Sequence, residues 1–203
     1  KALDLGINFF DTADLYEQGQ NEVLLGETLG ANRKNVIIAS KVGNQLSSDK
    51  SSWSWNPSKE YILSAIDESL KRLKTDYIDL YQLHGGTIDD PTDETIEAFE
   101  ILKQQGKIRT YGISSIRPNV IREYTKRSNI ASNMMQYSLL DRRPEETALD
   151  LLYQNNISVI TRGTVAKGLL AGKPAKDYLG HSAEIVKKAS DTIHAIAQKT
   201  DKT

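Results

Sequence analysis

The sequence predicts an α/β fold in which short parallel β-strands alternate with α-helices. β-Rich runs recur along the chain, and each is followed by a loop and then by a helical pattern of apolar residues. The connections are short, and strands that alternate with helices in this way pair in parallel through helical crossovers. The candidate strands are Ile7 to Asp11, Val36 to Lys41, Tyr77 to His84, Ile108 to Ser114, Asn133 to Gln136 and Ser158 to Arg162.

The most regular helical pattern follows the second of these strands. Its apolar and small side chains recur every three or four residues and so form one face of a helix. They are Ile62, Ala65, Ile66, Ser69, Leu70 and Leu73. Asn56 and Pro57 are expected to be the N-cap and the first residue of this helix.

Two later helices and one helix end are also predicted. The helix from Asp93 to Gln105 stops at Gly106, which is a common C-terminal signal. The opening KALDL is interpreted as the end of an earlier helix. The helix from Ala183 to Gln198 is expected to bury Val186, Ala189, Ile193 and Ile196.

Two architectures have this alternation, an open doubly wound sheet and a closed (β/α)8 barrel, or TIM barrel. A doubly wound sheet favours G-x-G-x-x-G after its first strand, and neither Gly112 nor the pair Gly85 and Gly86 has that spacing. A barrel places functional side chains at the carboxyl ends of several strands. The predicted strands end in this way, at Asp11, Lys41, His84, Ser114, Gln136 and Arg162. We therefore expect the barrel, although strands can also end simply where polar loops begin.

Only about six of the eight strand–helix units of a barrel are visible, and a barrel usually needs about 250 residues. We interpret residues 1–203 as a single barrel domain that is incomplete at both ends, with the first and last units absent. Six strands alone would leave two open parallel edges. The chain starts at Lys1 without a signal-peptide pattern, so we expect its start to be processed or missing.

The composition is that of an ordinary globular protein, and it argues against several partners. The net charge is −1 and the basic residues are spread along the chain, so neither nucleic acid nor an anionic membrane is expected to bind. No apolar run approaches the roughly 18 residues of a membrane span. There is no cysteine, which excludes disulfides and is compatible with the cytoplasm. The three histidines lack ligand spacing, so no metal site is expected.

Four residues near the strand ends indicate a reaction: Asp11, Tyr16, Lys41 and His84. A phenol with a pKa of about 10 is a poor acid at neutral pH, but a neighbouring ammonium group stabilises the phenolate. A partly buried lysine in turn needs a counter-ion, which an aspartate one strand away supplies. A histidine that donates a hydrogen bond can orient a carbonyl oxygen toward the tyrosine. Such a set is a general-acid site for reducing C=O with a hydride supplied from elsewhere.

Each of these residues also has an ordinary structural interpretation. Asp11 could cap the following turn, Tyr16 could pack in the core, and Lys41 could extend to solvent. His84 could be a hydrogen-bonded structural histidine. The order and spacing of the four residues favour the catalytic interpretation.

Four segments carry a family resemblance: NFFDTADLY, IIASKVG, DYIDLYQLHGG and YGISS. They resemble, in the same order, the signature segments of the aldo-keto reductases, and the similarity to the bacterial-type general oxidoreductase branch spans essentially the whole chain. The resemblance implies a (β/α)8 barrel and NADPH-dependent carbonyl reduction. It implies that Asp11, Tyr16, Lys41 and His84 form the catalytic tetrad. Tyr16 would protonate the carbonyl oxygen, Lys41 and Asp11 would tune it, and His84 would orient the substrate.

The resemblance also implies a nicotinamide site after the later strands. Ser114 and Gln136 would hold the carboxamide. Ser115 stands where the family usually has asparagine, and its hydroxyl can still donate or accept a hydrogen bond. Arg162 stands where an aromatic side chain often stacks on the nicotinamide, and its planar guanidinium can lie against the ring.

The segment TRGTVAKGLLAGK resembles the loop that covers the cofactor pyrophosphate. Its glycines allow close approach, and its lysine adds charge. The residues expected to bind cofactor here are Gly163, Val165, Gly168, Leu170 and Lys173. The alternative is a flexible loop with no ligand. The preference for NADPH over NADH comes from the resemblance alone, because the segment that usually grips the 2′-phosphate lies beyond Thr203.

Trp53 and Trp55 lie in a polar loop after the strand that carries Lys41. They either wall a substrate pocket or pack the loop onto the barrel rim. We expect a cytoplasmic NADPH-dependent reductase of small aldehydes or ketones, with its oligomeric state left open. A second hypothesis is a cofactor-binding regulatory subunit with little turnover, similar to the potassium-channel β subunits of the same superfamily. A third is a barrel isomerase or lyase that uses Lys41 as a Schiff-base amine.

Overall fold

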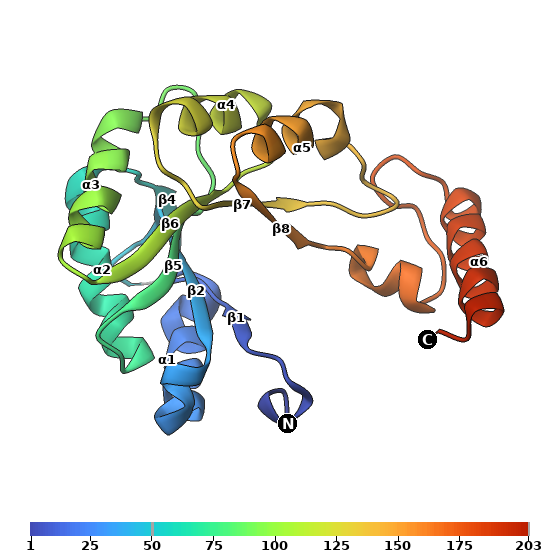
Figure 1. Ribbon diagram of the computed structural model, residues 1–203, viewed down its shortest axis with the longest axis horizontal. Helices are drawn as coiled ribbons and strands as arrows, with labels where there is room; N and C mark the ends of the chain where they lie inside the picture. The colour runs from blue at the N-terminus through green and yellow to red at the C-terminus, as the bar shows by residue number, and fades with distance from the viewer. Residues whose placement is uncertain (50, 203) are drawn as a thin grey trace.

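The computed structural model describes residues 1–49 and 51–202 of the chain. Six parallel strands form one sheet that curls into part of a barrel (Figure 1). In spatial order they are β1 (Phe9–Asp11), β2 (Ile37–Val42), β5 (Ile78–Leu83), β6 (Ile108–Ser114), β7 (Ser132–Gln136) and β8 (Ser158–Arg162). The predicted parallel architecture with six strand–helix units of a (β/α)8 barrel is confirmed, and the strand ends lie within one or two residues of the predicted ones.

Helices cover the outer, convex face of this sheet (Figure 1). They are α1 (Gln20–Leu29), α2 (Lys59–Leu73), α3 (Thr92–Gln104), α4 (Pro118–Arg127) and α5 (Pro144–Gln154). Short 3₁₀ helices connect several elements, at η1 (Leu3–Leu5), η2 (Tyr16–Gly19) and η3 (Gly30–Asn35). The last helix, α6 (Ala183–Thr200), lies apart from the others and packs on η4 (Ala166–Ala171).

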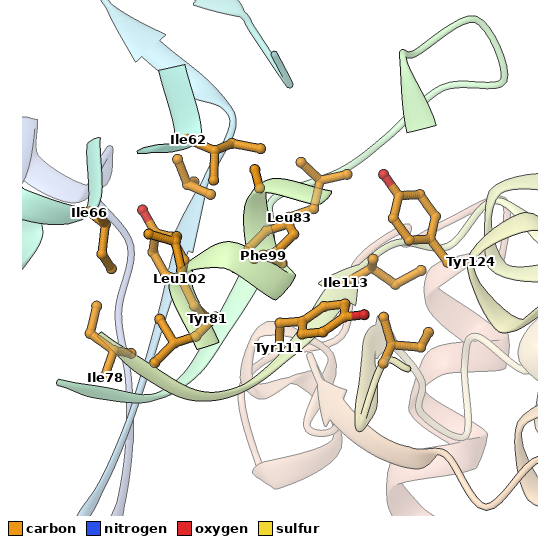
Figure 2. Packing of buried hydrophobic residues seen from close by; sticks show 14 of the residues in the cluster. Ile62, Ile66, Ile78, Tyr81, Leu83, Phe99, Leu102, Tyr111, Ile113 and Tyr124 are labelled. Atoms are coloured by element: carbon orange, nitrogen blue, oxygen red, sulfur yellow. The ribbon is translucent and has the colours of Figure 1, made fainter. Parts of the chain in front are cut away.

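The main core fills the space between the sheet and the outer helices, as Figure 2 shows. The Phe99 ring of α3 stacks on Tyr111, with centroids 5.3 Å apart, and meets the Tyr81 ring edge-on at 5.8 Å. Tyr81 and Tyr111 lie on strands, where side chains alternate between the two faces, so their neighbours in sequence point to the opposite, concave face. Lys41 and Gln82, which pair in register across β2 and β5, belong to that concave face. The curvature of the sheet therefore gathers the functional side chains on its concave side.

The predicted start of α2 is wrong by two residues. The helix begins at Lys59, and Ser58 is the N-cap, whose Oγ accepts a hydrogen bond from the Tyr61 backbone N–H. Asn56 instead accepts a bond from the Ser58 backbone N–H. Serine and asparagine are both good caps, so the pattern of residue types alone did not separate them.

Two predictions about later helices meet different outcomes. Helix α3 ends at Gln104 and is followed by Gly106 at φ 73°, which confirms glycine as the stop signal. In α6, Val186 is buried and Ala189 and Ile193 are partly buried, but Ile196 is 56% exposed. The expectation that Ile196 is buried is therefore wrong, because the contact of α6 with η4 does not cover its last turns.

The tryptophan-rich segment is not an irregular loop as expected. It forms an antiparallel hairpin of β3 (Asn44–Leu46) and β4 (Trp53–Trp55), in which Asn44 pairs with Trp55. The alternation Trp53-Ser54-Trp55 has the period of a strand, and this signal was missed.

Candidate active site

Lys41 and Asp11 form an ion pair at the carboxyl end of the first two strands. Lys41 Nζ lies 2.7 Å from Asp11 Oδ2 and also donates to the Thr12 carbonyl oxygen at 2.7 Å. The Lys41 side chain is only 1% exposed, whereas that of Asp11 is 33% exposed. A buried ammonium needs a counter-ion and hydrogen-bond acceptors, and the adjacent strand supplies both.

Tyr16 stands over this ion pair in the turn that follows β1. The Lys41 Nζ lies 5.0 Å from the centroid of the Tyr16 ring. The ring of His84 approaches Tyr16 edge-on, with centroids 5.7 Å apart and an interplanar angle of 79°. Tyr16 is 38% exposed, so part of its side chain is accessible to solvent.

His84 directly follows β5 and is uncharged at neutral pH. Burial, and then the positive charges of Lys41 and Arg162, lower the pKa of His84 from 6.5 to about 4. Its Nδ1 is buried and has no hydrogen-bond partner among the described residues. A neutral imidazole can donate from one nitrogen and accept at the other, so His84 can hydrogen-bond a carbonyl group without adding charge.

These four residues line one cavity of about 570 Å³ on the concave face of the sheet. Ser114 and Arg162 line it from β6 and β8. Four further lining residues were not identified from the sequence: Phe9, Met134, Ile160 and Thr161. Their signal was their place on the strands. Phe9 lies two positions before Asp11 and Ile160 two before Arg162, so each shares the face of its strand end, but this alternation does not identify Thr161.

Ser114 and Ser115 lie at the end of β6 and differ in what they can offer. Ser114 lines both the main cavity and a smaller one of about 180 Å³, while Ser115 lines only the smaller one. Ser115 is 3% exposed, and its hydroxyl oxygen accepts a hydrogen bond from the Arg117 backbone N–H at 3.2 Å. Asn133 holds Ser115 by two bonds, from its amide to the Ser115 carbonyl and from the Ser115 N–H to its oxygen. Ser115 is thus held inside a tight turn, which leaves Ser114 as the more accessible hydroxyl.

Gln136 and Arg162 end β7 and β8 side by side. Arg162 Nη1 donates to Gln136 Oε1 at 3.1 Å, and Gln136 Nε2 donates to Asp141 Oδ2 at 2.8 Å. Arg162 lines both cavities, whereas Gln136 lines a separate hollow between the starts of α4 and α5. The structure therefore joins Gln136 to the site through Arg162.

The segment after β8 folds into a compact turn rather than an open loop. Gly163 and Gly168 have φ 69° and 93°, a conformation that favours glycine. Leu170 is buried in the small core beneath α6, and Val165 is 52% exposed. The Lys173 side chain packs on Gly168, where an added Cβ would lie 2.7 Å from Lys173 Cδ.

The two tryptophans do not line the main cavity. Trp55 packs against the backbone of Gly43 and Gly85 at the rim, and its Nε1 donates to Asp90 Oδ1 at 2.8 Å. Trp53 is 57% exposed. This placement favours the rim-packing interpretation for Trp55.

The described residues contain no group of three or more acidic or histidine side chains placed to hold a metal ion. Within the same part of the chain, no helix has both the length and the apolar character needed to cross a bilayer.

The ion pair of Lys41 and Asp11, the Tyr16 ring and the His84 ring meet at one end of a parallel sheet that forms part of an α/β barrel. The model of the aldo/keto reductase family matches residues 1–203, and the chain belongs to that family. Among curated relatives, the uncharacterised oxidoreductase YqkF of Bacillus subtilis is 55% identical over 97% of this chain and 67% of its own length. The NADH-specific methylglyoxal reductase of Escherichia coli is 34% identical over 86% of this chain and 57% of its own length.

Solved structures of the same family have the same fold. The holo form of aldo-keto reductase AKR11C1 from Bacillus halodurans has a TM-score of 0.89 and 59% identity, over 92% of this chain and 63% of that one. An aldo-keto reductase from Klebsiella pneumoniae in complex with NADPH has a TM-score of 0.73 and 30% identity, over 85% of this chain and 60% of that one. The chain thus spans about two thirds or less of the length of these proteins.

Proposed function

We propose that the full-length protein transfers a hydride from NADPH to the carbonyl carbon of a small aldehyde or ketone, with Tyr16 as the general acid. The observation that carries this proposal is the convergence of Asp11, Tyr16, Lys41 and His84 on one cavity of about 570 Å³. A carbonyl oxygen that gains negative charge during reduction needs a proton and a positive potential. Tyr16 supplies the proton, and the buried charge of Lys41 stabilises the phenolate that remains.

His84 orients the substrate in this proposal. Its low pKa keeps the ring neutral, so the imidazole donates a hydrogen bond to the carbonyl oxygen and does not compete with Tyr16 as the acid. The same pKa argues against a role for His84 as the proton source near neutral pH. Asp11 keeps Lys41 charged and in place.

The residues beside the tetrad fit a nicotinamide ring. The cavity combines the apolar side chains of Met134 and Ile160 with the hydroxyl of Ser114 and the guanidinium of Arg162. An aromatic ring that bears a polar amide needs this combination of surfaces. When bound, NADPH would supply the hydride, with Ser114, Gln136 and Arg162 around its carboxamide. Ser115 and the turn residues Gly163, Val165, Gly168, Leu170 and Lys173 are proposed to complete the cofactor site.

The proposal of NADPH as the cofactor has support on one side and a counter-example on the other. The Klebsiella structure contains NADPH, whereas the Escherichia coli relative is named as NADH-specific. Comparing the two cofactors in one assay decides between them. We further propose that residues 1–203 are one barrel domain, incomplete at both ends, in a cytoplasmic protein. The two edges of the sheet, at β1 and β8, support the first part, and the lack of cysteine fits the second.

The experiment uses the full-length protein with NADPH and an activated aromatic aldehyde. Loss of NADPH absorbance and a stoichiometric alcohol product are expected, together with cofactor binding in a separate fluorescence titration. Binding without turnover would favour the regulatory-subunit alternative. Borohydride treatment with a carbonyl compound is expected to leave Lys41 unmodified, because Lys41 is an ion-paired cation here, and an adduct on Lys41 would favour a Schiff-base enzyme.

A further inference from the structure

A buried carboxylate lies behind the tetrad, on the helix side of β2. Glu22, in the first turn of α1, is fully buried. Its Oε1 accepts a hydrogen bond from Ser40 Oγ at 2.5 Å, and its Oε2 accepts one from Arg72 Nε at 2.7 Å. Arg72, on α2, also donates to Ser69 Oγ at 3.1 Å. The carboxylate is therefore paired and hydrogen-bonded at both oxygens, as a buried charge requires.

This network reaches both catalytic side chains of the proton-transfer pair. On one side, Ser40 immediately precedes Lys41 in β2, so the hydrogen bond from Ser40 to Glu22 fixes the backbone position from which the Lys41 side chain extends. On the other side, Glu22 lies one helical turn after the segment that carries Tyr16. The backbone N–H of Asp14, two residues before Tyr16, also donates to the Lys41 carbonyl at 3.2 Å.

The turn after Tyr16 has an unfavourable backbone conformation. Glu17, Gln18 and Gly19 have φ values of 50°, 58° and 92°, and residues other than glycine adopt this region reluctantly. Such turns persist where the surrounding structure holds them. The Arg72 side chain lies directly against this turn, because a Cβ built on Gly19 would be 3.0 Å from Arg72 Cδ.

We infer that Glu22 and Arg72 are positioning residues, which hold Tyr16 at a fixed place relative to Lys41. The inference rests on the proposed function, because it matters only if Tyr16 is the acid. Neither residue touches the cavity that holds the tetrad. They act through two contacts, Ser40 on β2 and Gly19 in the turn. A shift of the acid by about 1 Å can cost up to two decades in rate, so a network that fixes this distance has a large effect on turnover.

The first test compares Glu22→Gln with a matched control, Asp79→Asn. Asp79 forms a partly buried ion pair with Arg33, at 2.8 Å, but near the amino-terminal ends of the strands. We expect Glu22→Gln to lower kcat about tenfold or more, with the Kd for NADPH unchanged. Asp79→Asn is expected to lower stability but to leave kcat of the folded protein within about twofold. Equal effects of the two substitutions on kcat would mean that Glu22 is only structural.

A double-mutant cycle separates a positioning role of Glu22 from a purely structural one. If Glu22 acts through Tyr16, then Glu22→Gln costs about tenfold in the wild-type background and less than about twofold in the Tyr16→Phe background. The same loss in both backgrounds would overturn the inference. If the wild type has no turnover at all, the proposed function fails instead, so the two failures are distinguishable.

A second variant covers the case in which Glu22→Gln does not fold. Gly19→Ala keeps every charge of the network but forces the new methyl group against Arg72 and strains the turn at φ 92°. It is expected to lower kcat without changing NADPH binding. An unchanged kcat in a folded Gly19→Ala protein would contradict the positioning role.

Discussion

Lys41 and Asp11 share a 2.7 Å ion pair but differ sharply in exposure, since Lys41 is 1% exposed and Asp11 is 33% exposed. Both residues line the cavity, and the buried ammonium of Lys41 lies 5.0 Å from the centroid of the Tyr16 ring. Asp11 therefore holds the positive charge of Lys41 in place close to the Tyr16 ring. The effect of removing the Asp11 carboxylate on turnover can be measured.

Asp11→Asn removes the counter-ion and leaves Lys41 with the Thr12 carbonyl and a neutral amide. We expect kcat to fall by about 10- to 100-fold, because the charge beneath Tyr16 is then less stable and less well placed. Steady-state kinetics with NADPH and an aldehyde measure this loss. The cofactor Kd is expected to stay the same, and a normal kcat would exclude a role for the ion pair in proton transfer.

Two buried groups give opposite pH dependences of stability. Burial, and then the charge of Glu22, raise the pKa of Asp14 to about 7 from the usual 3.8. The stability linked to Asp14 is therefore complete below pH 3.8 and is lost as the pH rises to 7. For His84, whose pKa falls to about 4 from 6.5, stability is complete above pH 6.5 and is lost as the pH falls to 4.

These two effects oppose each other in the wild type. Substituting one group therefore reveals how the other changes the stability with pH. Relative to the wild type, Asp14→Asn is expected to gain stability as the pH rises from 4 to 6.5, and His84→Gln is expected to lose it. Each change is on the order of 3 kcal/mol across that range. Urea unfolding of the three full-length proteins at several pH values measures it. Parallel stability curves would show that neither group is perturbed in this way.

Trp55 tests which interpretation of the hairpin is correct. Trp55→Phe keeps an aromatic ring over Gly43 and Gly85 but loses the Nε1 bond to Asp90. We expect the free energy of unfolding to fall by about 1 kcal/mol, with KM unchanged for substrates of different size. Trp53→Phe is the control, and its effect on both quantities should be small. A KM that rises with substrate size, at unchanged stability, would place Trp55 in the substrate pocket instead.

Arg162→Met removes a guanidinium from the cavity and frees Gln136. The Kd for NADPH is expected to rise about tenfold, equivalent to about 1.4 kcal/mol, because the planar cation is removed and Gln136 loses its hydrogen bond from Arg162. Fluorescence titration of NADPH measures it. Arg142→Met removes a surface ion pair with Glu145 outside the cavity and should leave Kd unchanged. Equal binding by both variants would mean that Arg162 does not contact the cofactor.

The strands and the tetrad were predictable because the information is local. Runs of apolar residues that end at Asp11, Lys41 and His84 have the pattern of buried parallel strands. Parallel strands bring their carboxyl ends to one edge, so three strand ends and a tyrosine five residues beyond Asp11 had to meet.

Features that depend on several elements were not predictable. Glu22 is one of two acidic residues in α1, with Glu27, and its burial follows only from the simultaneous approach of Ser40 and Arg72. Arg72 lies on α2 between Lys71 and Lys74, which are both exposed, yet the Arg72 side chain turns inward to Glu22. The sequence period likewise identified the apolar face of α6 but not where its contact ends, which is why Ile196 is exposed.

The most direct test of the central claim is turnover of the full-length Tyr16→Phe variant beside the wild type. Both would be assayed with NADPH and an activated aromatic aldehyde, and cofactor binding would be measured for each. We predict that kcat falls by roughly two or more decades while the Kd for NADPH is kept, because only the acidic hydroxyl is lost. A Tyr16→Phe variant as active as the wild type would contradict the assignment of Tyr16 as the general acid.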